Sequence, residues 1–210
     1  MHIITKKVTL LPASFVGTRI GIEITDEDLT WGMSSGSLAA ESESVRIDWG
    51  DGTSETRAGI SQLTHTYAAP GRYVVSLSDD LATLKVAVIT KTSPFYAYAK
   101  RITAFFSNAQ RLVELPTLAF VDASSLRTLD LSQSNIKTLG NNTFKGCTAL
   151  QPELFFPSVT NPGGSTFKDC KQLTRIHFSD SNKAEITSLS SFQTDPTLGT
   201  GILDICWFDL

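Results

Sequence analysis

Five phenylalanines in the second half of the chain are each followed six residues later by a leucine. The phenylalanines are Phe106, Phe120, Phe144, Phe167 and Phe192, and the leucines are Leu112, Leu126, Leu150, Leu173 and Leu198. A recurring step of this kind marks structural units that can bury their apolar faces only by stacking on one another. The register therefore predicts a solenoid of stacked coils, an architecture that is typical of binding rather than of catalysis.

The spacing of these phenylalanines indicates the length of each coil. Successive intervals are 14, 24, 23 and 25 residues, and all but the first lie in the range of roughly 20–29 residues of leucine-rich repeats. We therefore interpret the unit that starts at Phe106 as a truncated cap. In a full unit, the phenylalanine is followed by a small residue or cysteine, the leucine and a short alternating strand, as in FKGCTAL with LFFPSV and FKDCKQL with TRIHFS.

Composition excludes several classes of partner. With 18 Lys and Arg against 21 Asp and Glu, the net charge of -3 gives no basic footprint for nucleic acid or an anionic membrane. No apolar run approaches the roughly 20 residues that cross a bilayer. The first residues, MHIITKKVTLLPASF, contain a short apolar stretch broken by Pro12, which predicts a strand rather than a secretory signal. If the protein is exported, its signal has been removed or it uses another route.

The three cysteines are too few and too widely spaced for a disulfide framework. Cys147 and Cys170 each lie three residues after a repeat phenylalanine, so we expect them at equivalent sites of adjacent coils as buried free thiols. The alternative is a zinc pair, but neither a CxxC motif nor a nearby histidine pair completes a tetrahedral set. We therefore predict neither a metal nor another cofactor.

The first half of the chain has the pattern of a small β-sandwich. Four segments are rich in alternating, β-branched or aromatic residues: RIGIEI (19–24), VRIDW (45–49), RYVVSL (72–77) and TLKVAVI (83–89). Such segments predict strands, and turn signals such as Gly-Asp-Gly and Ala-Pro-Gly separate them. The fold class predicted for the whole chain is mainly β, with an N-terminal immunoglobulin-like sandwich and a C-terminal solenoid whose coils contain short helices or turns.

Two signatures in this half resemble the PKD domain, an immunoglobulin-like module of cell-surface and secreted proteins. They are WGDGT at Trp49–Thr53 and HTYxxPGxYxVxL at His65–Leu77. The long polar stretch at 24–44 is less typical of that family. The resemblance implies that His65 has a structural role near the start of a strand.

The residues of these signatures also have a direct physical interpretation. Asp51 and Gly52 form a pair expected in a tight hairpin that needs positive φ, and Asp48 can accept backbone N–H bonds across the turn. The rings of Tyr67 and Tyr73 are expected to fill the core, and each hydroxyl then needs a hydrogen-bond partner. Alternatively, Asp48 and Asp51 are two ligands of a calcium site, although such a site needs six to eight oxygens.

A change in composition at 90–101, TKTSPFYAYAKR, indicates a boundary between a domain at 1–92 and a domain at 93–210, with aromatic residues sealing the junction. Beyond it, from Phe106 to the C-terminus, the units resemble BspA-like leucine-rich repeats, whose pattern is FxxCxxLxxIxLPxSV. These repeats occur on bacterial and protist surface antigens and adhesins. Ala109, Ala123 and Asp195 replace the cysteine in the first, second and last units. The last strand, ILDICWFDL, is interpreted as a lid or as an edge covered by another subunit.

The predicted strands place a candidate binding site on one face. If Leu129 and Leu131 point into the core, alternate residues point outward; by the same rule Ser179 points outward. The outward residues proposed as tentative ligand-binding residues are Asp130, Phe155, Arg175 and His177. An exposed aromatic beside charged groups can stack on a sugar or anchor a peptide. The alternative is a solvated sheet face with Phe155 covered by a loop or by the first domain.

The sequence contains no motif of a hydrolase, phosphate-binding or metalloprotease site, so we predict that the protein is not an enzyme. The resemblances imply a cell-surface or secreted adhesion or ligand-binding module of a bacterium, whose partner is a host or bacterial protein or glycan. Two other functions remain open. One is a structural or receptor-binding component of a phage tail or similar appendage. The other is a carbohydrate-active role, either as the detached accessory module of an enzyme or as a weak hydrolase that uses paired carboxylates.

Overall fold

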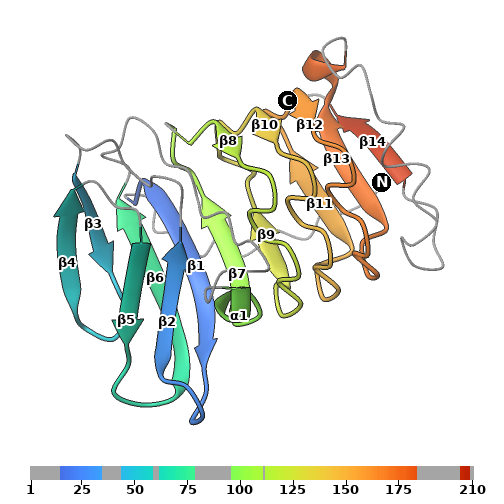
Figure 1. The fold of residues 1–210 in the computed structure, drawn as a ribbon. Helices are drawn as coiled ribbons and strands as arrows, with labels where there is room; N and C mark the ends of the chain where they lie inside the picture. The colour runs from blue at the N-terminus through green and yellow to red at the C-terminus, as the bar shows by residue number, and fades with distance from the viewer. Residues whose placement is uncertain are drawn as a thin grey trace, which may run out of the picture.

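The computed structural model describes residues 15–34, 44–58, 62–78, 96–110, 112–183 and 204–208. They form a mainly β structure in which an N-terminal antiparallel part continues into a C-terminal solenoid of about three turns (Figure 1). The predicted fold class is confirmed. No helix within the described ranges is long and apolar enough to cross a membrane.

The N-terminal part consists of two facing sheets. Its strands are β1 (Gly17–Ile24), β2 (Thr30–Ser34), β3 (Ser44–Asp48), β4 (Ser54–Ala58), β5 (Gln62–Thr66) and β6 (Gly71–Ser78). One sheet has the order β4-β3-β6-β1, and β2 pairs with β5 in the other. The alternating apolar residues of the larger sheet, such as Ile22, Ile47 and Val75, are buried together with Trp31. This alternation is the reason that one face of each strand forms the core.

Three of the four strands predicted for this half are confirmed as β1, β3 and β6. The fourth predicted strand, at 83–89, lies outside the described residues, as does most of the predicted first strand at 1–15. The strands β2, β4 and β5 were not predicted, because their sequences TWGMS, SETRA and QLTHT are short and carry few β-branched apolar residues.

The solenoid contains two ladders of short parallel strands. After the helix α1 (Tyr96–Ala99), its elements are β7 (Ile102–Ser107), β8 (Glu114–Leu115), β9 (Thr128–Asp130), β10 (Thr138–Leu139), β11 (Glu153–Phe156), β12 (Asn161–Pro162), β13 (Arg175–Ser179), the 3-10 helix η1 (Asp180–Asn182) and β14 (Asp204–Phe208). Parallel pairs join β7 to β9, and β13 to both β11 and β14. The strands β8, β10 and β12 form the second ladder.

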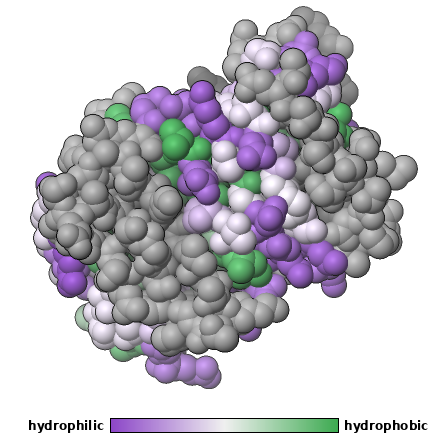
Figure 2. Space-filling view, turned by 45° about the horizontal axis from the view of Figure 1, so that its top comes forward, coloured by the Kyte–Doolittle hydropathy of each residue, from purple (hydrophilic) through white to green (hydrophobic). Residues whose placement is uncertain are grey.

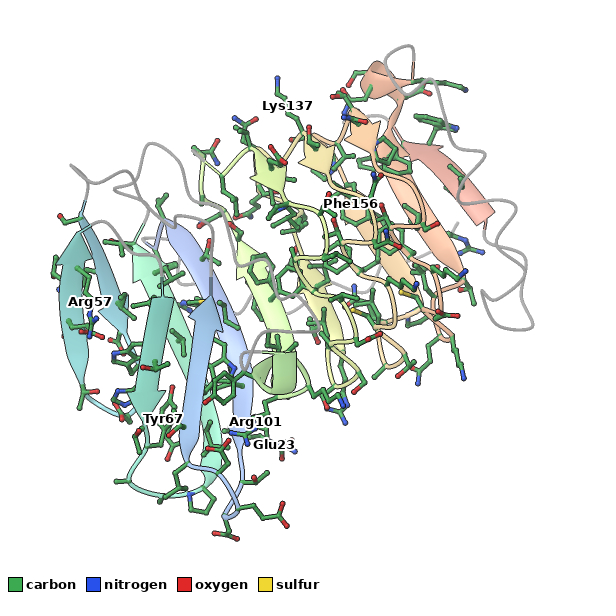
Figure 3. The ribbon with its side chains drawn as sticks, viewed as in Figure 1. Glu23, Arg57, Tyr67, Arg101, Lys137 and Phe156 are labelled. Carbon is green, nitrogen blue, oxygen red and sulfur yellow. The ribbon has the colours of Figure 1, made fainter. Side chains whose placement is uncertain are left out.

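The repeat phenylalanines of the central coils form a stack inside the solenoid. Phe144 lies parallel to Phe120, with ring centroids 5.3 Å apart, and parallel to Phe167 at 5.5 Å. All three side chains are buried, and Phe156, labelled in Figure 3, packs beside Phe167. Because each ring contacts its equivalent in the next coil, the apolar surface of one coil is buried by its neighbour.

The two predicted buried cysteines are confirmed at equivalent positions. The Sγ of Cys147 donates to the carbonyl oxygen of Phe120 (3.2 Å), and the Sγ of Cys170 donates to that of Phe144 (3.1 Å). Both are free thiols. Burial raises the pKa of the Cys147 thiol, and the neighbouring Cys170 raises it further, so both features favour an unreactive protonated thiol.

The interpretation of Phe106 as the repeat phenylalanine of a truncated first coil is wrong. Phe106 belongs to β7, where it is the register partner of Asp130, while Phe105 is the partner of Leu129. Phe105 is therefore the inward residue, and its ring meets Phe120 edge to face at 4.8 Å. The adjacent phenylalanines share a strand and point to opposite faces, so the short interval of 14 residues joined two positions that are not equivalent.

Each of the three described turns that precede a repeat leucine contains two residues in the left-handed region. These residues are Leu118 and Asp122, Asn142 and Gly146, and Ser165 and Asp169. They lie two positions before and two after Phe120, Phe144 and Phe167. Backbone hydrogen bonds join the turns of successive coils, including Phe120 N to Thr143 O and Phe144 N to Thr166 O. The coils therefore stack through turns on this side rather than through helices.

The first strand of the solenoid continues the N-terminal sheet. β7 pairs antiparallel with β1, so the order of the combined sheet is β4-β3-β6-β1-β7-β9 (Figure 1). Arg101 strengthens this junction by donating to the carbonyl oxygens of Asp28 (2.9 Å) and Thr30 (2.8 Å). Its own carbonyl oxygen accepts the backbone N–H of Glu23 at 2.9 Å; both residues are labelled in Figure 3. The Nε1 of Trp31 donates to the carbonyl oxygen of Tyr98. The predicted boundary at residue 92 remains a prediction, since residues 79–95 lie outside the described ranges.

Candidate functional site: the outer face of the solenoid strands

The alternation of β11 and β13 places the predicted site residues on the outer face. Leu154 and Phe156 are buried, while Phe155 between them is 36% exposed. The register pairs Phe155 with His177 and Glu153 with Arg175. The structure therefore brings Phe155, Arg175 and His177 together. Asp130 lies on β9, where it pairs with Phe106 of β7.

The Phe155 and His177 rings form the centre of this face. They lie parallel, with centroids 4.2 Å apart and an interplanar angle of 8°. Phe208 of β14 meets Phe155 edge to face at 6.1 Å. This contact between residues of three adjacent strands holds the rings in a fixed arrangement, so the exposed part of Phe155 is a preorganised apolar surface.

Charged residues flank the ring pair. Arg175 Nη1 donates to Glu153 Oε1 at 2.6 Å, with both side chains a little over 40% exposed. An exposed ion pair of this kind contributes little to stability, and its charged groups lie at the surface of this face. The Asp130 carboxylate accepts hydrogen bonds from the backbone N–H and the hydroxyl of Ser132, which orients it along its own strand.

The surroundings of His177 favour the neutral form of its imidazole. Burial lowers the pKa of His177, the positive charge of Arg175 lowers it further, and Glu153 acts in the opposite direction. Its Nε2 is buried and has no hydrogen-bond partner among the described residues. A neutral ring stacked on Phe155 supplies flat apolar area, which suits ligand contact more than proton transfer.

One predicted outward residue is placed differently. Ser179, at the end of β13, is fully buried and its hydroxyl lies 2.8 Å from that of Ser181. The prediction that it faces outward is wrong, because the 3-10 helix η1 starts at the next residue and turns the chain over it.

The signature residues of the N-terminal part form a structural cluster. The His65 ring stacks on Trp49 at 4.7 Å and meets Tyr67 edge to face, and its Nε2 lies 2.7 Å from Asp51 Oδ2. Burial alone raises the pKa of the Asp51 carboxyl, but hydrogen bonds from Thr53 and His65 outweigh it and bring the pKa to about 2. The Tyr67 hydroxyl donates to the carbonyl oxygen of Trp49. The cluster therefore links strands through satisfied contacts.

The hairpin that precedes this cluster partly matches its prediction. The Asp48 carboxylate accepts the Gly50 N–H at 2.9 Å, as predicted. Positive φ occurs at Gly50 and Gly52 rather than at Asp51. Both Asp51 oxygens are engaged within the protein, Oδ1 by Thr53 and Oδ2 by His65. In the described ranges, no group of three or more His, Cys, Asp and Glu side chains is placed to hold a metal ion.

Two residues of the outer face were not predicted from the sequence. Glu153 pairs with Arg175, and Phe208 packs on Phe155. Glu153 could have been identified from the same alternation that identified Phe155, because it lies two positions before Phe155 on the same strand. Phe208 could not, because its position depends on the register between β13 and β14.

These features define the class of the protein: a leucine-rich-repeat solenoid whose coils are formed by two strand ladders and a ladder of turns. A family model described as the BspA type leucine rich repeat region matches residues 91–198, with six copies. The chain belongs to this family, which is associated with surface and binding proteins and is typically non-catalytic.

Comparison with individual proteins adds one solved structure. A leucine rich repeat protein of T. pallidum is similar at 15% sequence identity, over 61% of this chain and 73% of that chain, with a TM-score of 0.25. No curated protein matches.

Proposed function

We propose that the protein is a non-catalytic ligand-binding module of the cell surface, which contacts a protein or glycan with the outer face of β11 and β13. The observation that carries this proposal is the stacked pair of Phe155 and His177, which is partly exposed and flanked by Glu153 and Arg175. Aromatic residues fixed in this way combine large contact area with a low entropic cost of binding.

The rest of the proposal concerns location and the N-terminal part. The family suggests a surface location. We propose that the N-terminal sheets are a PKD-like module, a proposal supported by the cluster of Trp49, Asp51, His65 and Tyr67 within the matching signatures. In this interpretation, the module supports the solenoid and presents its outer face to the ligand.

A glycan and extracellular-matrix binding screen tests the function. Wild type is compared with Phe155→Ala and His177→Ala, and with Lys168→Ala, which changes a side chain in a turn away from the strand face. We expect the first two variants to lose binding to whichever probe wild type captures, while Lys168→Ala retains it. Binding retained by all three variants would contradict the proposed face. A homotrimer without any captured ligand would instead favour the role in a phage tail or similar appendage.

A further inference from the structure

The outer face of the solenoid continues across the junction onto the N-terminal sheet. One row of register partners crosses five strands in the order Asp48, Ser76, Arg19, Phe106 and Asp130. Because paired residues on adjacent strands point to the same face, these five side chains share one surface. That surface joins the N-terminal part to the first coils without an interruption in the sheet.

A hollow lies on this surface beside the row. Its floor contains Gly21, opposite Val74 of β6 and Ala104 of β7. A Cβ at Gly21 would lie 3.1 Å from both Ala104 Cβ and Thr103 Oγ1, so small residues keep the floor low. The apolar wall consists of Val74, which is 49% exposed, and the edge of the largely buried Phe106, and the hollow has a volume of about 400 Å³. This volume is in the range of small-molecule sites.

A β-bulge adds a hydroxyl to the lining. The register between β1 and β7 shifts between Gly21 and Ile22, where Ala104 and Ile102 are the respective partners, so Thr103 is the extra residue. Thr103 lines the hollow together with Ser76. Bulges often redirect a side chain beside a functional site, and here the result is a pair of hydroxyl-bearing residues on opposite sides of Gly21.

The charges of the hollow differ in sign from the charge of the chain. Its lining includes the two arginines Arg19 and Arg72 and one acidic residue, Asp48, a net charge of one positive unit in a protein of net charge -3. Arg72 is 80% exposed and lies 3.5 Å from Glu23, so it can turn to a ligand. A second hollow, lined by Arg46 as well as Arg19 and Asp48, adjoins the first. Arginine is suited to bidentate contacts with a carboxylate.

The backbone around the hollow restricts the kind of ligand. β6 and β1 are interior strands of the combined sheet and pair on both sides, as β7 does with β1 and β9. An extended peptide that binds to a sheet needs a free strand edge, and the floor offers none. Recognition must therefore come from side chains, which here combine an apolar wall, hydroxyls, a carboxylate acceptor and guanidinium groups.

We propose that this hollow, lined by Arg19, Phe106, Thr103, Asp48 and Arg72, binds an acidic sugar unit of a glycan. The sugar ring packs on Val74 and on the exposed edge of Phe106, its carboxylate contacts the arginines, and its hydroxyls bond to Thr103, Ser76 and Asp48. This site lies beyond the face of Phe155 and His177. Binding at one of the two sites therefore does not depend on binding at the other.

Ligand-observed NMR titration of the full chain tests the site. The probes are methyl β-glucuronide, methyl β-glucoside, which has the same ring without the carboxylate, and a short glutamate-rich peptide. The variants are Arg19→Gln, Arg72→Gln and Val74→Trp, the last of which fills the hollow from an exposed position. Arg57→Gln, on the edge strand β4, removes an arginine that does not line the hollow. Phe155→Ala tests independence from the other face, and thermal unfolding verifies that each variant is folded.

We expect the glucuronide to bind wild type, Arg57→Gln and Phe155→Ala alike. Its affinity should fall by roughly tenfold in Arg19→Gln and Arg72→Gln, as expected for loss of a charge-assisted contact, and should be lost in Val74→Trp. The affinity of wild type for the neutral glucoside should be no higher than the affinity of the arginine variants for the glucuronide. Equal affinity for the two sugars, unchanged affinity in Val74→Trp, or binding of the peptide alone would overturn the proposal.

Discussion

Replacing Phe167 by alanine tests whether the stack of repeat phenylalanines holds the solenoid together. The Phe167 side chain is buried, lies parallel to Phe144 at 5.5 Å and packs against Phe156 at 5.8 Å. Removing a fully buried phenylalanine costs about 3–5 kcal/mol, because the lost transfer energy and the residual cavity add. The two aromatic neighbours place Phe167→Ala in the upper part of this range. That is a large share of the total of about 5–15 kcal/mol of a typical domain.

The assay is urea unfolding, followed by far-UV circular dichroism and tryptophan fluorescence to verify that both signals report one transition. Phe155→Ala is the matched control, since it removes the same atoms from a ring that is 36% exposed; its cost should be about 1–2 kcal/mol, in proportion to the part of the ring that is buried. Phe167→Leu keeps most of the volume and should cost within about 1.5 kcal/mol. If Phe167→Ala is no more destabilised than Phe155→Ala, the stack does not carry the stability that the geometry assigns to it.

Three further predictions concern the turns, the junction and the outer face. Asp169→Gly should stabilise the protein by about 1 kcal/mol in urea unfolding, since Asp169 has a φ of 63° where the preceding coil has Gly146; a loss of stability would contradict this. Arg101→Met should cost about 2–3 kcal/mol in the same assay, because it leaves the carbonyls of Asp28 and Thr30 without their charged donor. In the folded protein the pKa of His177 is below 6.5, so the unfolded chain takes up a proton first as the pH falls and stability declines below about pH 6.5. Between pH 7.5 and about pH 5, the melting temperature of His177→Gln should therefore fall less than that of wild type. Equal falls would refute the lowered pKa of His177.

The central coils were predictable from the sequence, and their two ends show why prediction failed elsewhere. Phe120, Phe144 and Phe167 occupy the same position in successive coils, and their rings stack on one another. This stack follows from a repeat that can be seen directly in the sequence. At the start of the solenoid, the sequence does not show which of the adjacent phenylalanines, Phe105 or Phe106, points into the core. The strand pairing decides between them, since Phe105 pairs with Leu129, and pairing between coils is a property of the fold rather than of the local pattern.

The left-handed residues of the turns illustrate a second limit. Gly146 is the residue type expected there, but the equivalent positions hold Asp122 and Asp169, and Leu118 has a φ of 65°. Leucine is not favoured in this region. The Leu118 N–H nevertheless donates to Asn141 in the next coil, and such hydrogen bonds between coils hold the backbone against its local preference.

The residues of the candidate site could be predicted from the sequence, but their contacts with one another could not. Alternation along β11 and β13 identified Phe155, Arg175 and His177, because outward residues on a strand follow from period two. The stacking of Phe155 on His177 and the approach of Phe208 depend on the register of three parallel strands. The role of these residues in binding remains a proposal. Figure 2 shows, among the described residues of the face in view, hydrophobic areas that are small and separated by hydrophilic ones.

The junction changes the role expected of the N-terminal part. A spacer joined by a flexible linker would leave β7 as the first strand of the solenoid, with a free edge that could pair with other chains. Instead, β1 pairs with β7 through five register positions, and the Thr18 and Ser107 hydroxyls, 89 positions apart in the sequence, lie 3.1 Å from each other. The Asn108 side chain adds hydrogen bonds to Gly17 and Phe15. Because terminal repeats of a solenoid require a cap, the N-terminal sheet acts as that cap, and it extends the outer face of the solenoid with a surface of its own.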